Sequence, residues 1–506
     1  MGFNNSSRTL NAGKNAFSAI ANKLFILILT FVSRKFFIKY IGIGYLGING
    51  LFANILTLLS MADLGLGTAL NVSLYKPIAE NDTRRITALV NYFKVIYRLI
   101  FVGVLIIGLS LLPFLKYLIN MEEDIPYIEL YYVVFVLKSA VSYLLVYKSS
   151  VLYADQKNFV INNIDAVVNS VKVAVQIAVI ILFKNYLLYI LLDVASVLIK
   201  NIIVSLKADK EYSFIKNDDK LDKEERKTIF SDVSSVFLYK IAWSLLNGTD
   251  NILMSIIVGT ITVGLYSNYY TITSAVELFI GLLFTSLTAS IGNLVATESN
   301  ERRYSVFKVM QMVSFWICGF TVVTLAFLMQ DFVTLWLGKE YVMDNLMLIA
   351  IVINVFFSTC MRPVWTFREG TGMYRQIRYI MFVTAILNLV LSIVLGKLLG
   401  ASGILFATSI SKVTTYFWYE PNILFRDFFK KNVLGYYLDY AKNISVVAIA
   451  LVICGAVFHF ISGVSILTIS LKCVVIFVVV NILFYLFYRK TDSFKVLLGR
   501  LKRVKN

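Results

Sequence analysis

Positively charged side chains inside long apolar segments are the residues of this sequence that could do chemistry. Of the 48 lysine and arginine residues, eleven fall within such segments, and Lys138, Lys172, Lys240 and Lys412 lie near the middle of theirs. A cation at the centre of a bilayer costs about 2.5–3.5 kcal/mol on insertion scales. We therefore expect these four lysines to face a water-filled cavity or a carboxylate partner.

Arg362 is a fifth cation of this kind, because it precedes Pro363 in the stretch RPVWTFREG. A proline removes a backbone donor, so we expect the helix to break there. Freed backbone groups are tolerated at membrane depth where they line an aqueous cavity. Ammonium and guanidinium groups bind phosphate and pyrophosphate well. Together with nearby acids, these cations predict a polar, net-positive cavity for an anionic substrate.

Carboxylates inside the apolar segments are fewer than cations. Asp250 in NGTDN and Glu277 in SAVELF could bind a coupling H⁺ or Na⁺, and each could equally be a structural hydrogen-bonding partner between helices. The lysines, likewise, could pair with acids only to hold helices together. The acids considered are Asp63, Asp165, Asp193, Asp250 and Glu277. Six other cations are expected to extend their charged groups to the membrane interface: Lys23, Lys94, Arg98, Lys148, Lys200 and Lys472.

Long apolar helices must position these residues. The chain has 506 residues, 58% of them hydrophobic and only 15% charged, whereas soluble domains average about 25% charged residues. About 20 apolar residues in a helix match the thickness of the hydrocarbon core. The sequence therefore predicts an all-α polytopic membrane protein with about fourteen transmembrane helices. The predicted spans are 15–37, 45–73, 89–115, 127–152, 160–183, 186–206, 230–258, 265–295, 307–328, 346–367, 377–398, 402–424, 443–460 and 467–488.

Lysine and arginine are distributed unevenly over the links between these spans. With the N-terminus inside, the inward links and tails hold 30 of them and the outward links hold seven. This is the positive-inside bias, so we expect a multi-pass protein of the cytoplasmic membrane with both termini inside. The net charge of +18 then reflects topology, and we expect no nucleic-acid partner.

The polar stretch KADKEYSFIKNDDKLDKEERK follows the sixth span and divides the chain into two halves. We predict an N-terminal six-helix bundle at 1–206, a cytoplasmic linker at 207–228, and a pseudo-symmetric C-terminal six-helix bundle at 229–424. Two additional helices and a basic cytoplasmic tail are predicted at 425–506. Duplicated halves with the substrate site between them are a common plan among transporters.

Catalytic and metal-binding motifs are absent from the sequence. It contains no P-loop, no G-x-S-x-G element and no H-E-x-x-H element, and His459 is its only histidine. These absences argue against ATP hydrolysis and against a metal site. We therefore predict a protein that is not an enzyme and has no cofactor, with H⁺ or Na⁺ as candidate coupling ions.

Three blocks of the sequence carry a family resemblance. The first is SRKFFIKYIGIGYLGINGLFANILTLLSMADLGLGTALNVSLYKPIAENDTRRITALVNYF, which contains Arg34 at the outer end of helix one. The second is GTDNILMSIIVGTITVGLYSNYYTI, and the third is RPVWTFREGTGMYRQIRYIMFVTAILNLVLSIVLGKLLGASGILFATSIS. They resemble the Wzx-like polysaccharide flippases of the multidrug/oligosaccharidyl-lipid/polysaccharide (MOP) exporter superfamily over about residues 8–430. The likeness is greatest to the Gram-positive capsule and exopolysaccharide branch.

This resemblance implies a MATE-like fold with two six-helix bundles around a central cationic cavity, working by alternating access. It also implies that an undecaprenyl-pyrophosphate-linked oligosaccharide moves from the cytoplasmic to the outer leaflet for cell-surface polysaccharide synthesis. The last two helices resemble those of fourteen-helix members, in which such helices can shape a groove for the lipid tail.

The cations expected to contact the substrate on this basis are Arg34, Lys138, Lys172, Lys240, Arg362 and Lys412. The residues expected to serve ion coupling or to line the cavity with polar groups are Asp63, Asp250, Asn251 and Glu277. The expected partners are a lipid-linked oligosaccharide and membrane lipid, with a polysaccharide polymerase and chain-length machinery as further candidates.

Three other functions stay open at this point. One is a scaffold without transport, which the costly mid-membrane lysines make unattractive. A cation-coupled multidrug exporter of the same superfamily would be expected to have an acidic and aromatic site instead of a cationic one. A membrane enzyme acting on lipid-linked glycans would be expected to have larger extramembrane loops than this sequence provides.

Overall fold

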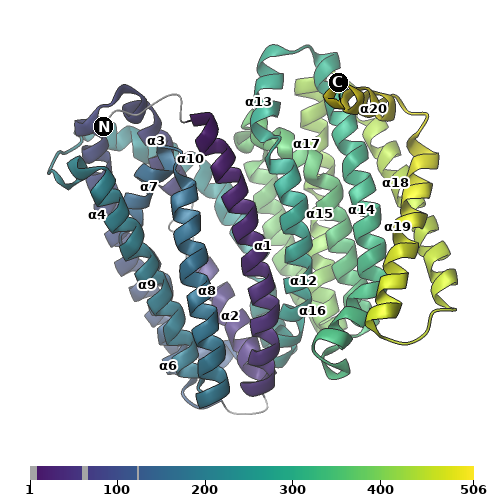
Figure 1. Cartoon of the computed structure of the whole chain (residues 1–506), viewed down its shortest axis with the longest axis horizontal. Helices are drawn as coiled ribbons and strands as arrows, with labels where there is room; N and C mark the ends of the chain where they lie inside the picture. The colour runs from purple at the N-terminus through teal and green to yellow at the C-terminus, as the bar shows by residue number, and fades with distance from the viewer. Residues whose placement is uncertain (1–7, 60–65, 122–124, 506) are drawn as a thin grey trace. The chain divides into compact units, whose positions relative to one another are not determined.

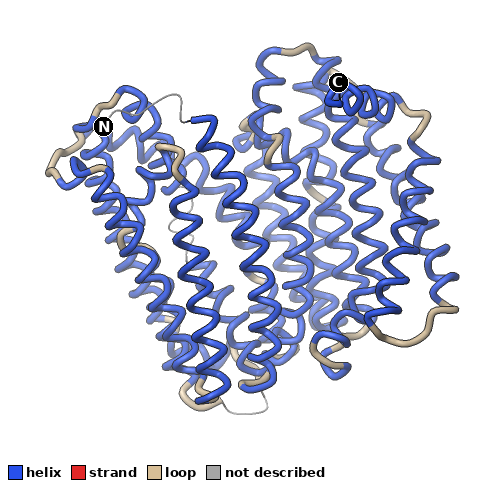
Figure 2. The backbone as a smooth tube through the Cα atoms, in the orientation of Figure 1, coloured by secondary structure: helices blue, strands red, loops and turns tan. Residues whose placement is uncertain are grey.

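Helices make up all the regular secondary structure in the part of the chain that the computed structural model describes, residues 8–59, 66–121 and 125–505 (Figure 2). They form two compact units, Met1–Gly264 and Leu265–Asn506. The predicted all-α fold class is therefore confirmed.

Unit 1 consists of long helices joined by short turns (Figure 1). Within it, α9 has a central place, because it packs against α6, α7 and α8, while α1 runs along α8. The elements are α1 (Arg8–Tyr40), α2 (Ile43–Leu59), α3 (Leu66–Glu80), α4 (Thr83–Ser110), η3 (Leu112–Phe114), α5 (Leu115–Leu118), α6 (Ile128–Ser142), α7 (Val146–Ala154), α8 (Asn158–Phe183), α9 (Tyr186–Glu211), η4 (Ser213–Lys216), α10 (Lys223–Gly248) and α11 (Asp250–Ile257).

Only two residues connect α8 to α9. Lys184 ends α8 in the left-handed region, with φ of 48°, and the Asn185 side chain accepts a hydrogen bond from the backbone N–H of Leu188 at 3.0 Å. This hydrogen bond satisfies one of the donors that a helix leaves unpaired at its start. The tight turn makes α8 and α9 antiparallel neighbours, so that polar side chains on their facing surfaces can meet.

The stretch predicted as a linker, 207–228, is folded onto unit 1. Thr87 on α4 donates to the Phe214 carbonyl at 3.0 Å. Asn91 on α4 donates to the carbonyls of Asn217 and Asp219 at 2.8 and 3.1 Å. Apolar side chains of the stretch, such as Leu221, are buried in the core that α3, α4 and α7 form. The predicted domain boundaries themselves stay a prediction.

Unit 2 is built around α14 and α15, which pack against each other, with α18 and α19 against α14. Its first helix, α12, begins four residues before the end of unit 1. The elements are α12 (Thr260–Thr285), α13 (Thr288–Thr297), α14 (Asn300–Trp336), η5 (Lys339–Tyr341), α15 (Asn345–Thr371), α16 (Tyr374–Thr414), α17 (Tyr416–Leu424), η6 (Phe425–Phe429), α18 (Leu434–Phe458), α19 (Ile466–Tyr488) and α20 (Asp492–Lys505).

A sharp reversal lies inside α16. Gly400 has φ of 63° and ψ of −143°, which no helix allows. On either side of it, Asn388 donates to the Thr408 hydroxyl at 3.1 Å, and the hydroxyls of Thr384 and Thr415 are 2.7 Å apart. In each pair the two residues lie at similar distances in sequence before and after Gly400. The two arms of α16 on either side of Gly400 therefore run antiparallel. This hairpin agrees with the separate spans predicted at 377–398 and 402–424.

The predicted helix break at Pro363 is wrong, because α15 continues through this residue. Proline lacks the N–H that would bond to the Thr359 carbonyl one turn earlier. In the structure that carbonyl accepts a hydrogen bond from the Ser314 hydroxyl of α14 at 2.6 Å. A neighbouring helix therefore satisfies the group that the proline leaves unpaired, which is how membrane helices tolerate proline.

The surface of both units is that of a multi-pass membrane protein. Large apolar side chains such as Leu99, Leu182 and Val452 are 67–72% exposed, whereas Ser314 and Asn388 are fully buried. By length and composition, nine helices among the described residues could cross a membrane, or ten if the bent pair α6–α7 is one span. In this number the segment Tyr374–Phe429 is one candidate span, although it contains the hairpin at Gly400. The number fourteen and the direction of insertion stay predictions.

We predict that Ser314→Ala lowers the free energy of unfolding by about 1–3 kcal/mol, since it leaves the buried Thr359 carbonyl unsatisfied. The effect should be smaller in a Pro363→Ala background, where the restored N–H can bond to that carbonyl. Thermal unfolding of the purified single and double variants in detergent measures this coupling. Equal effects of Ser314→Ala in both backgrounds would contradict the assignment.

Candidate functional site

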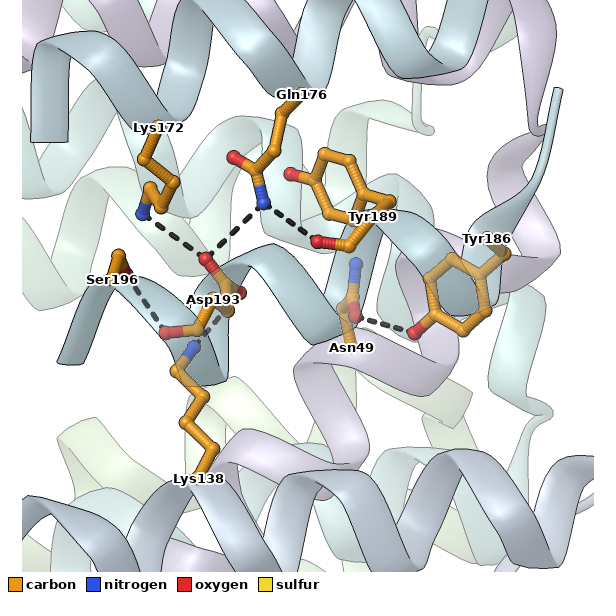
Figure 3. A network of polar contacts seen from close by, with 8 residues as sticks. All are labelled: Asn49, Lys138, Lys172, Gln176, Tyr186, Tyr189, Asp193 and Ser196. Carbon is orange, nitrogen blue, oxygen red and sulfur yellow. Dashed lines mark hydrogen bonds and ion pairs between the residues drawn. The ribbon is translucent and has the colours of Figure 1, made fainter. Parts of the chain in front are cut away.

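Lys138, Lys172 and Asp193 meet inside unit 1 (Figure 3). The Asp193 carboxylate, on α9, lies 2.9 Å from Lys138 Nζ on α6 and 3.1 Å from Lys172 Nζ on α8. We call these three residues the lysine–aspartate triad. Their side chains are 36%, 20% and 15% exposed in the order Lys138, Lys172, Asp193. Lys138 is thus the member most accessible to another molecule.

Gln176 on α8 holds the carboxylate in place between the two lysines. Its Nε2 atom donates to Asp193 Oδ1 at 3.2 Å and to the Tyr189 carbonyl at 2.9 Å. Gln176 is only 2% exposed, so these hydrogen bonds are shielded from solvent. The triad therefore has a supporting residue that fixes its geometry, and the sequence analysis did not identify it.

Arg34 adjoins the same region. It interacts electrostatically with Tyr189, which also interacts with Asp193 four residues further along α9. At the start of α9, the Tyr186 hydroxyl donates to Asn49 Oδ1 of α2 at 2.6 Å (Figure 3). One face of α9 thus gathers polar groups from α1, α2, α6 and α8. Arg34 and the two triad lysines are three of the six cations predicted to contact a substrate.

The triad has a net charge of +1, because two ammonium groups share one carboxylate. An ammonium group has three donors, and Asp193 receives one hydrogen bond from Lys138. Charges attract each other more strongly in a low-dielectric interior than in water. The arrangement can therefore hold an anionic group at the exposed side of Lys138, with Arg34 as a second source of positive charge.

Further ion pairs continue along α9 toward its C-terminal end. Lys200 pairs with Asp165, and Lys148 Nζ lies 2.7 Å from Asp209. We expected these lysines to extend to the interface, whereas the structure pairs each with a carboxylate. Asp209 was not predicted as a partner, because it lies in the stretch 207–228 that the sequence indicated as a linker.

Lys157 ends this series just before α8. It pairs with Asp155 at 2.8 Å and with Glu211, and Tyr212 donates to Asp155 at 2.5 Å. Burial, together with this hydrogen bond to a carboxylate, raises the pKa of Tyr212. The phenol therefore stays protonated and keeps its role as a donor.

Unit 2 presents its cations differently. Arg362 lies over the Trp365 ring at 5.4 Å, and its Nε atom is buried without a hydrogen-bond partner. On the same ring, at 5.9 Å, lies Arg368, which pairs with Glu420 of α17 at 3.0 Å. The side chains of this pair are only 9% and 1% exposed. Lys412 is half-buried on α16.

The Arg368–Glu420 pair was missed from sequence. Arg368 was counted in a cytoplasmic link, and Glu420 was not among the acids considered. A glutamate inside the predicted span 402–424 was the available signal, since an acid in a membrane helix needs a partner.

The predicted polar residues have separate environments. Glu277 on α12 accepts a hydrogen bond from Ser358 of α15 at 3.0 Å. Asp250 is the first residue of α11, and the Oδ1 atom of its neighbour Asn251 is buried without a hydrogen-bond partner. Asp63 and the side chain of Lys240 lie outside the residues that the structure describes.

An apolar groove lies between α14, α15 and α18 in unit 2. It has a volume of about 420 Å³, and its lining includes Val322, Val352, Phe356 and Val447. On another side of α14, Lys472 of α19 pairs with Asp331 at 2.6 Å. The last two predicted spans are therefore part of unit 2, where both pack against α14, and α18 forms a wall of the groove.

We predict that Asp193→Asn lowers the free energy of unfolding by about 3 kcal/mol, because it leaves two partly buried cations uncompensated. Lys138→Met should cost less, since the Lys172–Asp193 pair remains. The exposed pair Lys76–Glu80 supplies the control, and Lys76→Met should change stability by under about 0.5 kcal/mol. Thermal unfolding in detergent ranks the three variants; an Asp193→Asn effect no larger than the control would be inconsistent with a compensating role.

Several solved membrane transporters share this fold. The chain is similar to the lipid II flippase MurJ in an inward closed conformation, with TM-score 0.66 and 15% identity over 94% of this chain and 99% of that one. It is also similar to an inward-facing multidrug resistance MATE family transporter of the MOP superfamily, with TM-score 0.61 and 14% identity over 80% and 97%. A MOP superfamily transporter from Pyrococcus furiosus matches with TM-score 0.55 and 14% identity over 83% and 96%.

At these identities the likeness establishes the fold alone. No curated protein sequence matches the chain. The family model for polysaccharide biosynthesis proteins matches residues 12–288, which is more than half of the chain. This match covers the triad and the helices that hold it. The protein therefore belongs to the polysaccharide biosynthesis protein family and has the fold of MOP superfamily transporters.

Proposed function

We propose that this protein is a flippase that moves an undecaprenyl-pyrophosphate-linked oligosaccharide from the cytoplasmic to the outer leaflet of the cell membrane. The substrate would serve the synthesis of a surface polysaccharide, with the capsule and exopolysaccharide branch as the proposed subfamily. Transport would proceed by alternating access, with both termini in the cytoplasm.

The observation that carries this proposal is the excess positive charge of the lysine–aspartate triad. An ion pair that only held the helices together would need one lysine for one carboxylate. Here a second lysine is present, with Lys138 36% exposed and Arg34 nearby. A pyrophosphate is a multivalent anion that ammonium and guanidinium groups bind through charge-assisted hydrogen bonds. The triad therefore suits the pyrophosphate of a lipid-linked glycan.

We propose further substrate contacts from cations beyond the triad and Arg34. Lys240, Arg362 and Lys412 are the proposed contacts, and the buried, unpartnered Nε of Arg362 supports a role for this residue. Asp250 and Asn251 are proposed to line the outer part of the path.

The apolar groove between α14, α15 and α18 supports the lipid part of the proposal. A prenyl chain gains nothing from an aqueous cavity, and burial of its methylene groups in an apolar groove is favourable. The groove has an almost wholly aliphatic lining with Phe356 at one side. We propose that it accommodates part of the prenyl tail while the pyrophosphate is held by cations.

A cation-coupled drug exporter of the same superfamily is the alternative. Glu277 is a carboxylate in an apolar helix, hydrogen-bonded to Ser358, and is our candidate for binding a coupling H⁺ or Na⁺. The excess of cations over acids at the triad disfavours a cationic drug as the substrate, because like charges repel.

The proposal is tested by the triple variant Lys138→Met, Lys172→Met, Asp193→Asn. This variant removes all three charges together, so it leaves no buried charge uncompensated and should fold and insert normally. We expect surface-polysaccharide output to fall at least tenfold in cells that depend on the variant, because the anion-binding charge is lost.

The Lys76→Met variant, which removes an exposed lysine, is the matched control and should support normal output. Protein level in the membrane is measured in parallel. Normal polymer output from the triple variant at wild-type protein level would mean that the triad is structural, and would contradict the proposed anion site.

A further inference from the structure

Five tyrosines surround a cavity at one end of unit 1, where α1 ends and α2, α6 and α9 begin. The cavity has a volume of about 350 Å³, which lies at the lower end of the usual range for small-molecule sites, about 300–1,000 Å³. We call it the tyrosine pocket. It is lined by Tyr40, Ile41, Tyr45, Tyr127, Leu130, Tyr131, Lys184, Asn185, Tyr186 and Leu187.

Three of the tyrosine rings pack against one another at the base of the pocket. The ring centroids of Tyr45 and Tyr186 are 4.7 Å apart, those of Tyr131 and Tyr186 are also 4.7 Å apart, and the latter two rings are perpendicular. Tyr131 and Tyr186 are only 6% and 4% exposed. Tyrosines of a membrane-interface belt point toward the headgroups, whereas these point into the protein and form a wall.

Two of the lining residues have a left-handed backbone conformation. Tyr127, which is 73% exposed, has φ of 62°, and Lys184 has φ of 48°. Residues other than glycine rarely adopt this left-handed conformation, and such strain tends to collect at ligand sites. Both residues lie at helix ends, Tyr127 at the start of α6 and Lys184 at the end of α8, so these turns fix the position of two lining side chains.

The lining combines aromatic faces with hydrogen-bonding groups. Tyrosine rings offer an apolar face and a polar hydroxyl, and Lys184 and Asn185 add donors and an acceptor at the rim. A pyranose ring has the matching character, because its C–H bonds form apolar faces and its hydroxyls surround the edge. Drug-like or lipid ligands would instead be expected to require a mostly apolar lining.

We propose that the tyrosine pocket binds one or two sugar residues of a glycan, with the sugar ring stacked on Tyr127, which is 73% exposed. This deepens the proposed function and rests on it for the identity of the glycan. Tyr186, Tyr189 and Asp193 lie at intervals of three and four residues, which places them on one face of α9. Seven residues of helix span about 10 Å, so a glycan joined to a pyrophosphate at the triad can reach the pocket.

Saturation-transfer NMR with the purified full-length protein tests sugar binding directly. The detergent must carry no sugar headgroup, and the probes are glucose, galactose, N-acetylglucosamine and glucuronic acid. We expect at least one probe to receive saturation from the protein. Tyr127→Ala should reduce that signal at least fivefold, and Tyr127→Phe should retain most of it, since the phenyl face remains.

Tyr117→Ala is the matched control, because Tyr117 is a 65% exposed tyrosine of unit 1 that does not line the pocket. It should leave the signal unchanged. No saturation of any probe, or equal loss in Tyr117→Ala and Tyr127→Ala, would overturn the proposal. Because this assay needs no transport, sugar binding without flipping would refute only the flippase, and flipping without sugar binding would refute only the pocket.

Discussion

A charge inside an apolar helical unit requires a compensating charge close by, and Asp193 supplies it for two lysines at once. The carboxylate connects α6, α8 and α9 through Lys138 and Lys172. Gln176 then fixes the carboxylate from a fully shielded position. The same requirement explains the pairs that Lys148, Lys200 and Lys472 form. The triad differs from these pairs in having one cation in excess, and this difference is what makes it a candidate for binding.

Backbone groups obey a similar constraint. In a membrane every buried carbonyl and N–H needs a partner within the protein. Ser314 meets this need for the Thr359 carbonyl beside Pro363, and the hairpin at Gly400 keeps its arms joined through threonine and asparagine side chains. The helices of unit 2 can therefore contain a proline and a sharp turn and still pack against one another without unsatisfied backbone groups at these positions.

Much of the fold and part of the site could be predicted from sequence. Apolar run length alone predicts the helices, because the bilayer sets their minimum length. The cost of a buried cation identified Lys138 and Lys172, and Asp193 was among the candidate partners. Partnerships between helices were not predictable, since residues as distant in sequence as Arg368 and Glu420 meet only in the folded chain. The helix break at Pro363 was predicted wrongly because the rule considers one helix without its neighbours.

The cavities could not be predicted from the sequence either. The tyrosine pocket takes residues from three stretches of the sequence, 40–45, 127–131 and 184–187. None of its tyrosines is unusual for the end of a membrane helix. Only their mutual packing, with Tyr186 between Tyr45 and Tyr131, distinguishes them from an interface belt. Side-chain direction, which decides whether a tyrosine faces lipid or protein, is set by tertiary contacts.

The proposed flippase activity is tested most directly by leaflet-specific detection of a lipid-linked glycan in vesicles that contain the purified protein and no other protein. An undecaprenyl-pyrophosphate-linked oligosaccharide is placed in the vesicles, and the fraction cleaved by an externally added glycosidase is followed over time. We expect the initially protected fraction to become cleavable many times faster with the protein than in protein-free vesicles. The same slow rate with and without the protein would contradict the proposed activity.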